Sequence, residues 1–142
     1  MRINFAHLCD YALISQDRKL SVMGIFTAVL AQAMPWAHPQ MYLAFEVGIE
    51  PAELNHQGTI RIECVDEDGQ SVFKADGGVM AQGKARIGEH PAVPQILTFG
   101  NLTFVRAGEY NINFWLNDRL EHTLRFQVMP PGWTPQPPQG RP

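Results

Sequence analysis

The feature that most constrains the fold is a regular alternation of apolar and polar side chains between residues 108 and 128. In its first half every second residue is apolar: Tyr110, Ile112, Phe114 and Leu116. In its second half the same spacing recurs: Leu120, His122, Leu124, Phe126 and Val128. A period of two predicts β-strands that bury one face. The polar residues 117–119 between the two halves predict that these strands form a hairpin.

The loop of this hairpin is expected to contain three residues, Asn117–Arg119. A two-residue loop would place Phe114 opposite Glu121 and turn the two apolar rows to opposite faces, where one of them would meet water. The three-residue loop gives these pairs instead: Leu116 with Leu120, Ile112 with Leu124, and Tyr110 with Phe126. Its last position favours a positive φ, which suits Gly better than Arg119. The turn is therefore either slightly strained or built differently.

Other segments bounded by turn residues predict further strands: 3–14, 20–26, 41–49, 59–65, 71–76 and 96–104. Residues 28–34 have a helix-favouring composition, but the segment is short and ends at Pro35, so we read it as extended chain or a short strand. Residues 35–39 are expected to form a rigid loop. In the 96–104 segment the apolar phase slips at Gly100, and an inserted bulge residue is the simplest explanation.

Two of these segments carry additional information. Residues 3–14 have apolar groups on both faces, so this strand is either buried on both sides or changes sheet along its length. Gly24 in the next segment suggests a bulge or a close backbone approach. The turn Asp66–Gly69 predicts a second hairpin, in which a four-residue loop pairs Ile62 with Phe73.

About eight short strands and almost no helix predict an all-β fold, a two-sheet antiparallel sandwich that is immunoglobulin-like in style. This β-sandwich domain is expected to span residues 1–129. Tyr110 opens a late strand, where its hydroxyl can satisfy a backbone carbonyl at the corner of the sandwich. Residues 130–142 contain six prolines. Because proline cannot donate to a sheet or continue a helix, this Pro-rich tail is expected to be flexible and outside the domain.

Composition narrows the class of protein further. The net charge of −3 argues against a nucleic-acid partner, which would require basic clusters. No apolar run approaches the roughly 18 residues that span a bilayer, so no membrane partner is expected. His7 and Asp10 interrupt any signal-peptide core near the N-terminus. Cys9 and Cys64 lack metal or redox spacing, so they are expected to be free buried thiols of a cytoplasmic protein.

No catalytic motif stands out, and the sequence predicts neither an enzyme nor a metal or other cofactor. The acidic turn Asp66–Gly69 lacks the ligand spacing of a calcium loop, and a hairpin turn explains it. The histidines are scattered without a metal-binding pair. A site assembled from distant residues such as Asp10, His7 and His38 would be the enzymatic alternative, and their meeting in one pocket would favour it.

Four residues are candidates for contact with a partner or ligand. Trp115 occupies the outward row of its strand together with Asn111 and Asn113, and an aromatic ring beside amides can stack on and hydrogen-bond a carbohydrate-like small molecule. The same row also suits coverage by another protein or by a second subunit. Trp133 stands alone among prolines and could dock on the domain or on a partner.

Four segments together resemble a small uncharacterised bacterial family of β-sandwich proteins: Leu8–Ala12, Lys19–Phe26, His38–Leu43 and Gly108–Tyr110. The resemblance spans residues 2–128 and implies a bacterial origin and a β-sandwich, but no activity. The biochemical function is therefore unknown from the sequence. The leading interpretation is a non-enzymatic interaction or scaffold module that binds a protein partner or self-associates. A small-ligand binder and an enzyme are the alternatives.

Overall fold

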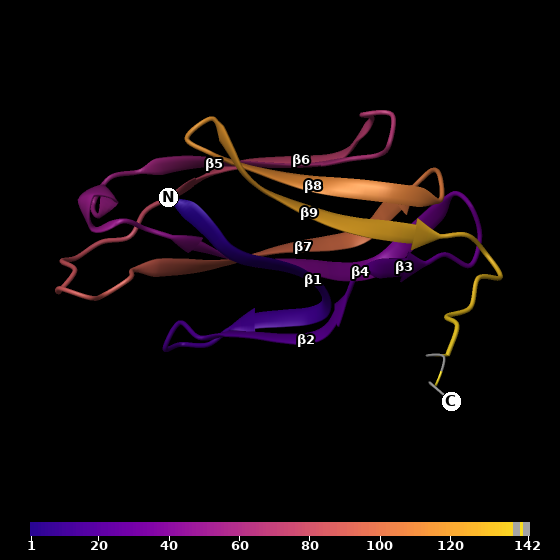
Figure 1. Ribbon diagram of the computed structural model, residues 1–142, viewed down its shortest axis with the longest axis horizontal. Helices are drawn as coiled ribbons and strands as arrows, with labels where there is room; N and C mark the ends of the chain where they lie inside the picture. The colour runs from indigo at the N-terminus through magenta and orange to yellow at the C-terminus, as the bar shows by residue number, and fades with distance from the viewer. Residues whose placement is uncertain (138–139, 141–142) are drawn as a thin grey trace.

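The computed structural model describes residues 1–137 and 140, and within them it contains two β-sheets packed face to face (Figure 1). The strands are β1 (Arg2–Ile14), β2 (Leu20–Phe26), β3 (Ala28–Leu30), β4 (Trp36–Gly48), β5 (Gly58–Val65), β6 (Ser71–Val79), β7 (Ala92–Phe104), β8 (Gly108–Leu116) and β9 (Arg119–Met129). One sheet has the order β2-β1-β4-β7 and the other the order β3-β9-β8-β5-β6. All pairs are antiparallel except β3 with β9. The prediction of an all-β, two-sheet sandwich is confirmed.

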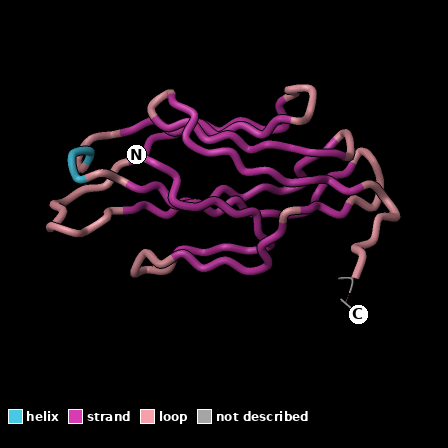
Figure 2. Tube along the Cα trace, in the orientation of Figure 1, coloured by secondary structure: helices cyan, strands magenta, loops and turns pink. Residues whose placement is uncertain are grey.

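Strands dominate the chain, and the only helical element in the described residues is the 3-10 turn η1 (Pro51–Glu53) (Figure 2). No helix in this part of the chain is long and apolar enough to cross a membrane. Residues 28–34, whose composition was ambiguous, include strand β3, which agrees with their interpretation as extended chain or a short strand. The predicted rigid loop at 35–39 is wrong, because β4 already begins at Trp36 and pairs there with Phe104.

The core lies between the two sheets and is built from the predicted inward rows. Tyr110, Ile112, Phe114 and Leu116 of β8 are at most 3% exposed. The ring of Phe114 meets that of Phe45 from the opposite sheet edge to face, with 5.4 Å between centroids. The Tyr110 hydroxyl donates to the Arg106 carbonyl oxygen at 2.6 Å, which confirms the expected corner. This bond satisfies a polar group that the apolar core could not.

The β8–β9 turn is built differently from the predicted three-residue loop. Only two residues form it, Asn117 with φ 50° and Asp118 with φ 65°, and Leu116 pairs directly with Arg119. Two successive positive φ values are the geometry of a tight type I′ hairpin turn. A register shift after Phe114 then makes Glu121 the extra residue of a bulge. The predicted pairs farther along are restored: Ile112 with Leu124, and Tyr110 with Phe126.

The β5–β6 hairpin also differs from its predicted register. The loop includes Gln70, whose carbonyl accepts a hydrogen bond from the Asp66 amide at 3.0 Å. Ile62 therefore pairs with Ala75 instead of Phe73. Because the shift amounts to two residues, every side chain keeps its predicted face.

The predicted bulge in β7 is wrong as well. The β4–β7 register runs from Trp36–Phe104 to Gly48–Ala92 without a shift. Instead, the alternation of apolar and polar side chains shifts by one residue on both strands at the same place, beside Pro39 on β4 and at Asn101 on β7, where φ is 52°. A paired distortion changes the buried row on each strand without adding a residue to either.

Strand β1 bends and contributes to two layers. Its first half, up to Cys9, pairs with β4, whereas its second half pairs only with β2. Figure 1 shows this second half returning beneath the β4–β7 sheet as a separate hairpin. There Ala12 and Val22 pack with Cys9 and Ala44 in a second, smaller core. The strand stays in one sheet, and its second half leaves Tyr11, Leu13 and Ile14 exposed, so neither predicted alternative, burial on both sides or a change of sheet, holds over its whole length.

Gly24 allows the bend. Its φ is +68°, and a Cβ atom there would lie 2.3 Å from a carboxylate oxygen of Asp10 on the neighbouring strand. Only glycine combines this backbone conformation with so close an approach. The atoms that approach Gly24 belong to the Asp10 side chain, and the β1–β2 register runs without a shift, so the predicted bulge or close backbone approach is wrong.

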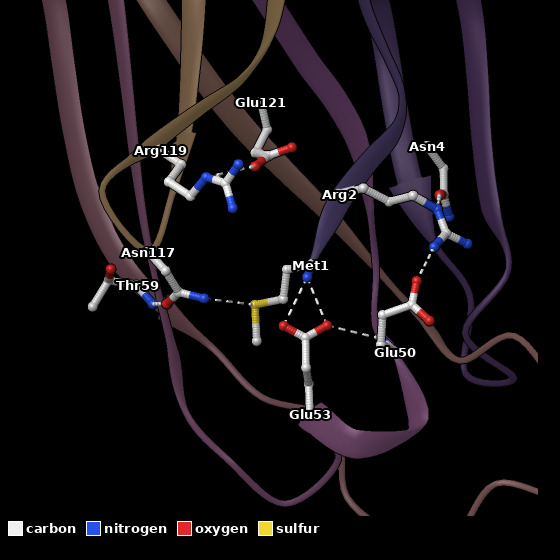
Figure 3. Close-up of polar contacts among 9 residues, drawn as sticks. All are labelled: Met1, Arg2, Asn4, Glu50, Glu53, Thr59, Asn117, Arg119 and Glu121. Carbon is white, nitrogen blue, oxygen red and sulfur yellow. Dashed lines mark hydrogen bonds and ion pairs between the residues drawn. The ribbon is translucent and has the colours of Figure 1, made fainter.

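The N-terminal amino group closes one end of the sandwich (Figure 3). It lies 2.6 and 2.7 Å from the two carboxylate oxygens of Glu53 in η1. Glu53 also accepts a hydrogen bond from the Glu50 amide at 2.9 Å. The side chain of Met1 is 2% exposed and fills the space above Gly58.

After Met129 the described residues of the tail form no further strand. The Trp133 amide donates to the Pro130 carbonyl at 3.2 Å in a local turn. The flexibility predicted for residues 130–142 remains a prediction, and residues 138–139 and 141–142 lie outside the described part of the chain.

Candidate interaction surfaces

Three of the four predicted contact residues lie on the outward face of the β3-β9-β8-β5-β6 sheet. Asn111, Asn113 and Trp115 occupy alternate positions of β8, opposite to its buried row. Paired positions on the neighbouring strands bring polar partners beside them: Arg61 next to Trp115, and Thr123 next to Asn113. The sequence prediction of one polar row around Trp115 therefore agrees with the geometry.

Trp115 is half-buried rather than an open stacking platform. The guanidinium carbon of Arg61 lies 4.4 Å from the centroid of the indole ring, which is a cation–π contact. A pocket of about 230 Å³ beside this pair is lined by Thr59, Ile60, Arg61, Asp76, Gly77, Trp115 and Asp118. One face of the indole is thus already occupied by the protein itself.

The amides and charges of this outward face are mostly paired among themselves. Thr123 Oγ1 donates to Asn113 Oδ1 at 2.9 Å. Lys74 Nζ and Glu63 Oε2 are 4.0 Å apart on the neighbouring strands. Among the buried side-chain atoms of the described residues, Asn111 Oδ1 and Arg61 Nε have no hydrogen-bond partner.

Trp133 lies near the other end of the same sheet. It lines a pocket of about 520 Å³ together with Thr27, Ala28, Glu109, Arg125, Phe126, Gln127 and Met129. Its side chain remains 41% exposed. Glu109 and Trp115 are six residues apart on β8, which corresponds to roughly 20 Å of strand. The structure therefore does not bring Trp133 to the Trp115 cluster.

The acidic turn is explained by its own hydrogen bonds. Asp66 Oδ1 accepts from the amides of Asp68 and Gln70, each at 2.9 Å. Arg106 forms a close ion pair with Asp68 and lies 4.0 Å from Asp66. Glu67 accepts from the Glu109 amide at 2.8 Å. These carboxylates tie the turn to the β7–β8 connection, and no group of three metal-ligating side chains occurs in the described residues.

The residues of the enzymatic alternative are not brought into one site. His7 pairs with Ala44 on β4, and His38 is six residues away from Ala44, roughly 20 Å along the same strand. His38 Nδ1 accepts a hydrogen bond from Trp36 Nε1 at 3.2 Å. Burial lowers the pKa of His38, and the negative charge of Asp10 opposes this shift in part.

Both cysteines are free and buried, as predicted. Burial raises the pKa of the Cys64 thiol to about 12, and burial likewise raises the pKa of Cys9. Thiols held neutral in this way are poor nucleophiles at neutral pH.

A second surface was missed by the sequence analysis. On the β1–β2 hairpin, four large apolar side chains at alternating positions are exposed: Tyr11 (47%), Leu13 (41%), Met23 (67%) and Ile25 (53%). We call these four residues the hairpin surface. Tyr11 and Met23 are direct cross-strand partners. The alternation itself was visible in the sequence, but it did not reveal which of two apolar faces would meet water.

The fold and these surfaces can be compared with known proteins. A family model described as a family of unknown function (DUF6941) matches residues 4–129. The alkylpurine DNA glycosylase AlkC of Pseudomonas fluorescens, solved bound to DNA with an abasic site analog, is similar over 87% of this chain with a TM-score of 0.44 and 11% identity. This chain spans 30% of that chain's length.

An immunoglobulin-like protein from Pseudomonas aeruginosa is similar over 90% of this chain and 95% of its own, with a TM-score of 0.41 and 17% identity. No curated protein matches the sequence.

Proposed function

This chain belongs to the family of unknown function DUF6941, and we propose that it works as a non-enzymatic interaction module that binds a protein through its hairpin surface. The observation that carries the proposal is the exposure of Tyr11, Leu13, Met23 and Ile25 on one small hairpin. A large apolar group in water forgoes the stabilisation that burial would provide. Clustered exposure of this kind is typical of surfaces that another molecule covers.

The chemistry of the hairpin surface suits a protein partner. Met and Tyr are enriched in the centres of protein interfaces, where charged residues are depleted. Met23 is flexible and polarisable, so it can adapt to the shape of a partner. Two charged residues of the hairpin, Asp17 and Lys19, pair with each other at 3.1 Å in its turn, away from this surface.

The carbohydrate-binding alternative receives less support. Arg61 covers one face of Trp115, and Asn113 is engaged by Thr123, so two of the predicted contact groups already have partners within the chain. We propose that this part of the sheet stabilises the fold. An enzymatic role is not proposed either, because His7 on β1 pairs with Ala44 of β4, roughly 20 Å along that strand from His38. A cytoplasmic location belongs to the same proposal, because a reducing compartment keeps free thiols such as Cys9 and Cys64 reduced.

Photo-crosslinking from two matched positions tests the proposal. A photo-reactive amino acid would replace Met23 on the hairpin surface, and in a second protein it would replace Thr123 on the outward face of the other sheet. In cells of the native host, we expect a discrete protein adduct from position 23 and none from position 123. Equal labelling from both positions, or no adduct from position 23, would contradict the proposal.

A further inference from the structure

We propose that the partner of the hairpin surface is a second copy of this chain, and that two copies pair their β2 strands antiparallel about a two-fold axis. This inference rests on the proposed function and names its partner. Its evidence is the edge of the sheet, which is a separate observation from the exposed side chains.

Strand β2 is an edge strand, and its outer side is unpaired in the described part of the chain. It pairs with β1 on one side, and among the residues that the structure describes no strand pairs with its other side. No loop residue in this part of the chain forms a backbone hydrogen bond to residues 20–26 either. In Figure 1 the strand lies at the outer margin of the molecule. Its outward amide and carbonyl groups are therefore open to pairing with another strand.

The other sheet edges carry the features that block such pairing. Strand β6 bears Lys74 and Asp76, and β7 bears Pro94. Strand β3 contains only three residues. The unpaired second half of β1 begins with Asp10. Charges, prolines and short length are the usual protections of an edge strand against association. Strand β2, Leu20–Phe26, has seven residues and carries neither a charge nor a proline, and its one irregularity is Gly24 with its φ of +68°.

Self-pairing fits this strand without electrostatic conflict. A two-fold axis at Met23 places Leu20 opposite Phe26 of the second copy and Met23 opposite its own counterpart. All seven residues of β2 are uncharged, so no like charges meet across the axis. The charged turn at Arg18 and Lys19 then lies beside the uncharged residue Thr27 of the second copy. The same pairing brings the two hairpin surfaces side by side as one apolar face.

The interface would be small. One seven-residue strand and the side chains around it are fewer than the roughly 20–30 residues per partner of a standard interface. We therefore expect a reversible dimer with a dissociation constant in the micromolar range, on the order of 1–100 μM.

A charge-swap experiment tests the two-fold axis. Sedimentation velocity should show a monomer–dimer equilibrium for the wild-type protein. Met23→Lys places two positive charges opposite each other and should weaken the dimer roughly tenfold or more. Met23→Glu should do the same, and an equimolar mixture of the two variants should recover the dimer. The matched control Thr123→Lys adds the same charge to the other sheet and should leave the equilibrium unchanged.

Disulfide trapping tests the register. Residues directly opposite each other in an antiparallel pair have Cα atoms about 4.5–5.5 Å apart, which a disulfide can span. Met23→Cys should therefore form a covalent dimer under mild oxidation, and Thr123→Cys should not. Burial raises the pKa of both native thiols, so Cys9 and Cys64 should not compete. Because Met23 is 67% exposed, these variants should fold, and their urea midpoints would verify it.

A wild-type protein that stays monomeric at several hundred micromolar would overturn the inference, as would a dimer that both Met23→Lys and Met23→Glu leave intact. In the first case, an adduct between position 23 and a different protein in cells would leave the proposed function standing. A monomer without any such adduct would remove both.

Discussion

At the scale of single residues, the contact between Glu53 and the N-terminal amino group links stability to pH. The hydrogen bond from the Met1 ammonium is the main cause that lowers the pKa of Glu53 below its ordinary value of 4.5. A carboxyl group whose pKa is lower in the folded state stabilises the fold above its unfolded pKa. This stabilisation is lost as the pH falls through the folded pKa.

Glu53→Gln should therefore lower the free energy of unfolding at pH 7 by about 1 kcal/mol or less, because the carboxylate is partly exposed and screened by water. The difference from wild type should shrink as the pH falls through the lowered pKa of Glu53, because the wild-type carboxyl group then also becomes neutral. Urea unfolding at pH 7 and at a series of lower pH values, on protein whose chain starts at Met1, measures it. Glu121→Gln is the control, since its partner Arg119 is 84% exposed and 4.0 Å away. A difference that grows in acid would contradict the assignment.

Phe114 tests the core at the same scale. Its side chain is fully buried against Phe45 and His122. Phe114→Ala should lower the free energy of unfolding by roughly 3–5 kcal/mol, because it leaves a cavity that the two sheets cannot fill. Glu121→Ala, at the bulge, should change it by less than about 0.5 kcal/mol. Chemical denaturation compares the two, and similar losses would mean that the buried row of β8 is assigned to the wrong face.

At the scale of elements, the β8–β9 turn predicts an unusual gain from a single substitution. Asp118 holds a φ of 65°, and Asn117 before it already accepts a hydrogen bond from the Thr59 amide at 3.0 Å. Asp118→Gly creates the Asn-Gly sequence that type I′ turns prefer, and should raise the free energy of unfolding by up to about 1 kcal/mol. Asp118→Val should lower it by about 1 kcal/mol or more, since a β-branched residue resists positive φ. In a three-residue loop the positive φ would fall at Arg119 instead of Asp118, so these two opposite effects would not be expected. The urea midpoints of both variants therefore decide between the two turns.

At the scale of the whole molecule, the tail is expected to contribute little to the fold. Strand β9 ends at Met129, whose carbonyl accepts a hydrogen bond from the Ala31 amide at 3.2 Å, so this bond does not involve the tail. Deleting residues 130–142 should leave the thermal midpoint nearly unchanged and reduce the free energy of unfolding by less than about 2 kcal/mol, the scale of one large apolar side chain. A larger loss would show that Trp133 is an integral part of the structure. The substitution Trp133→Ala separates its contribution from that of the prolines.

The sequence by itself determined the strands and their buried rows. Alternation along β8 and β9 is a local property, since successive side chains of any strand point to opposite faces. The aligned pairs Ile112–Leu124 and Tyr110–Phe126 could therefore be predicted, because burial of both rows allows only one parity of register. The same logic located the corner at Tyr110. It could not distinguish a three-residue loop from a two-residue turn with a bulge at Glu121, because both give the same pairing beyond the bulge.

Only the tertiary structure decided what happens to a strand with two apolar faces. Residues 3–14 read the same whether both faces are buried or one remains in water. The bend beside Gly24 folds the β1–β2 hairpin beneath β4 and β7, which buries Ala12 and Val22 and leaves Tyr11 and Met23 outside. Local alternation shows which side chains are apolar, whereas the exposure of each side chain depends on which distant strand packs over it. For the same reason, the hairpin surface and the free edge of β2 emerged only once all nine strands of the described chain were in place.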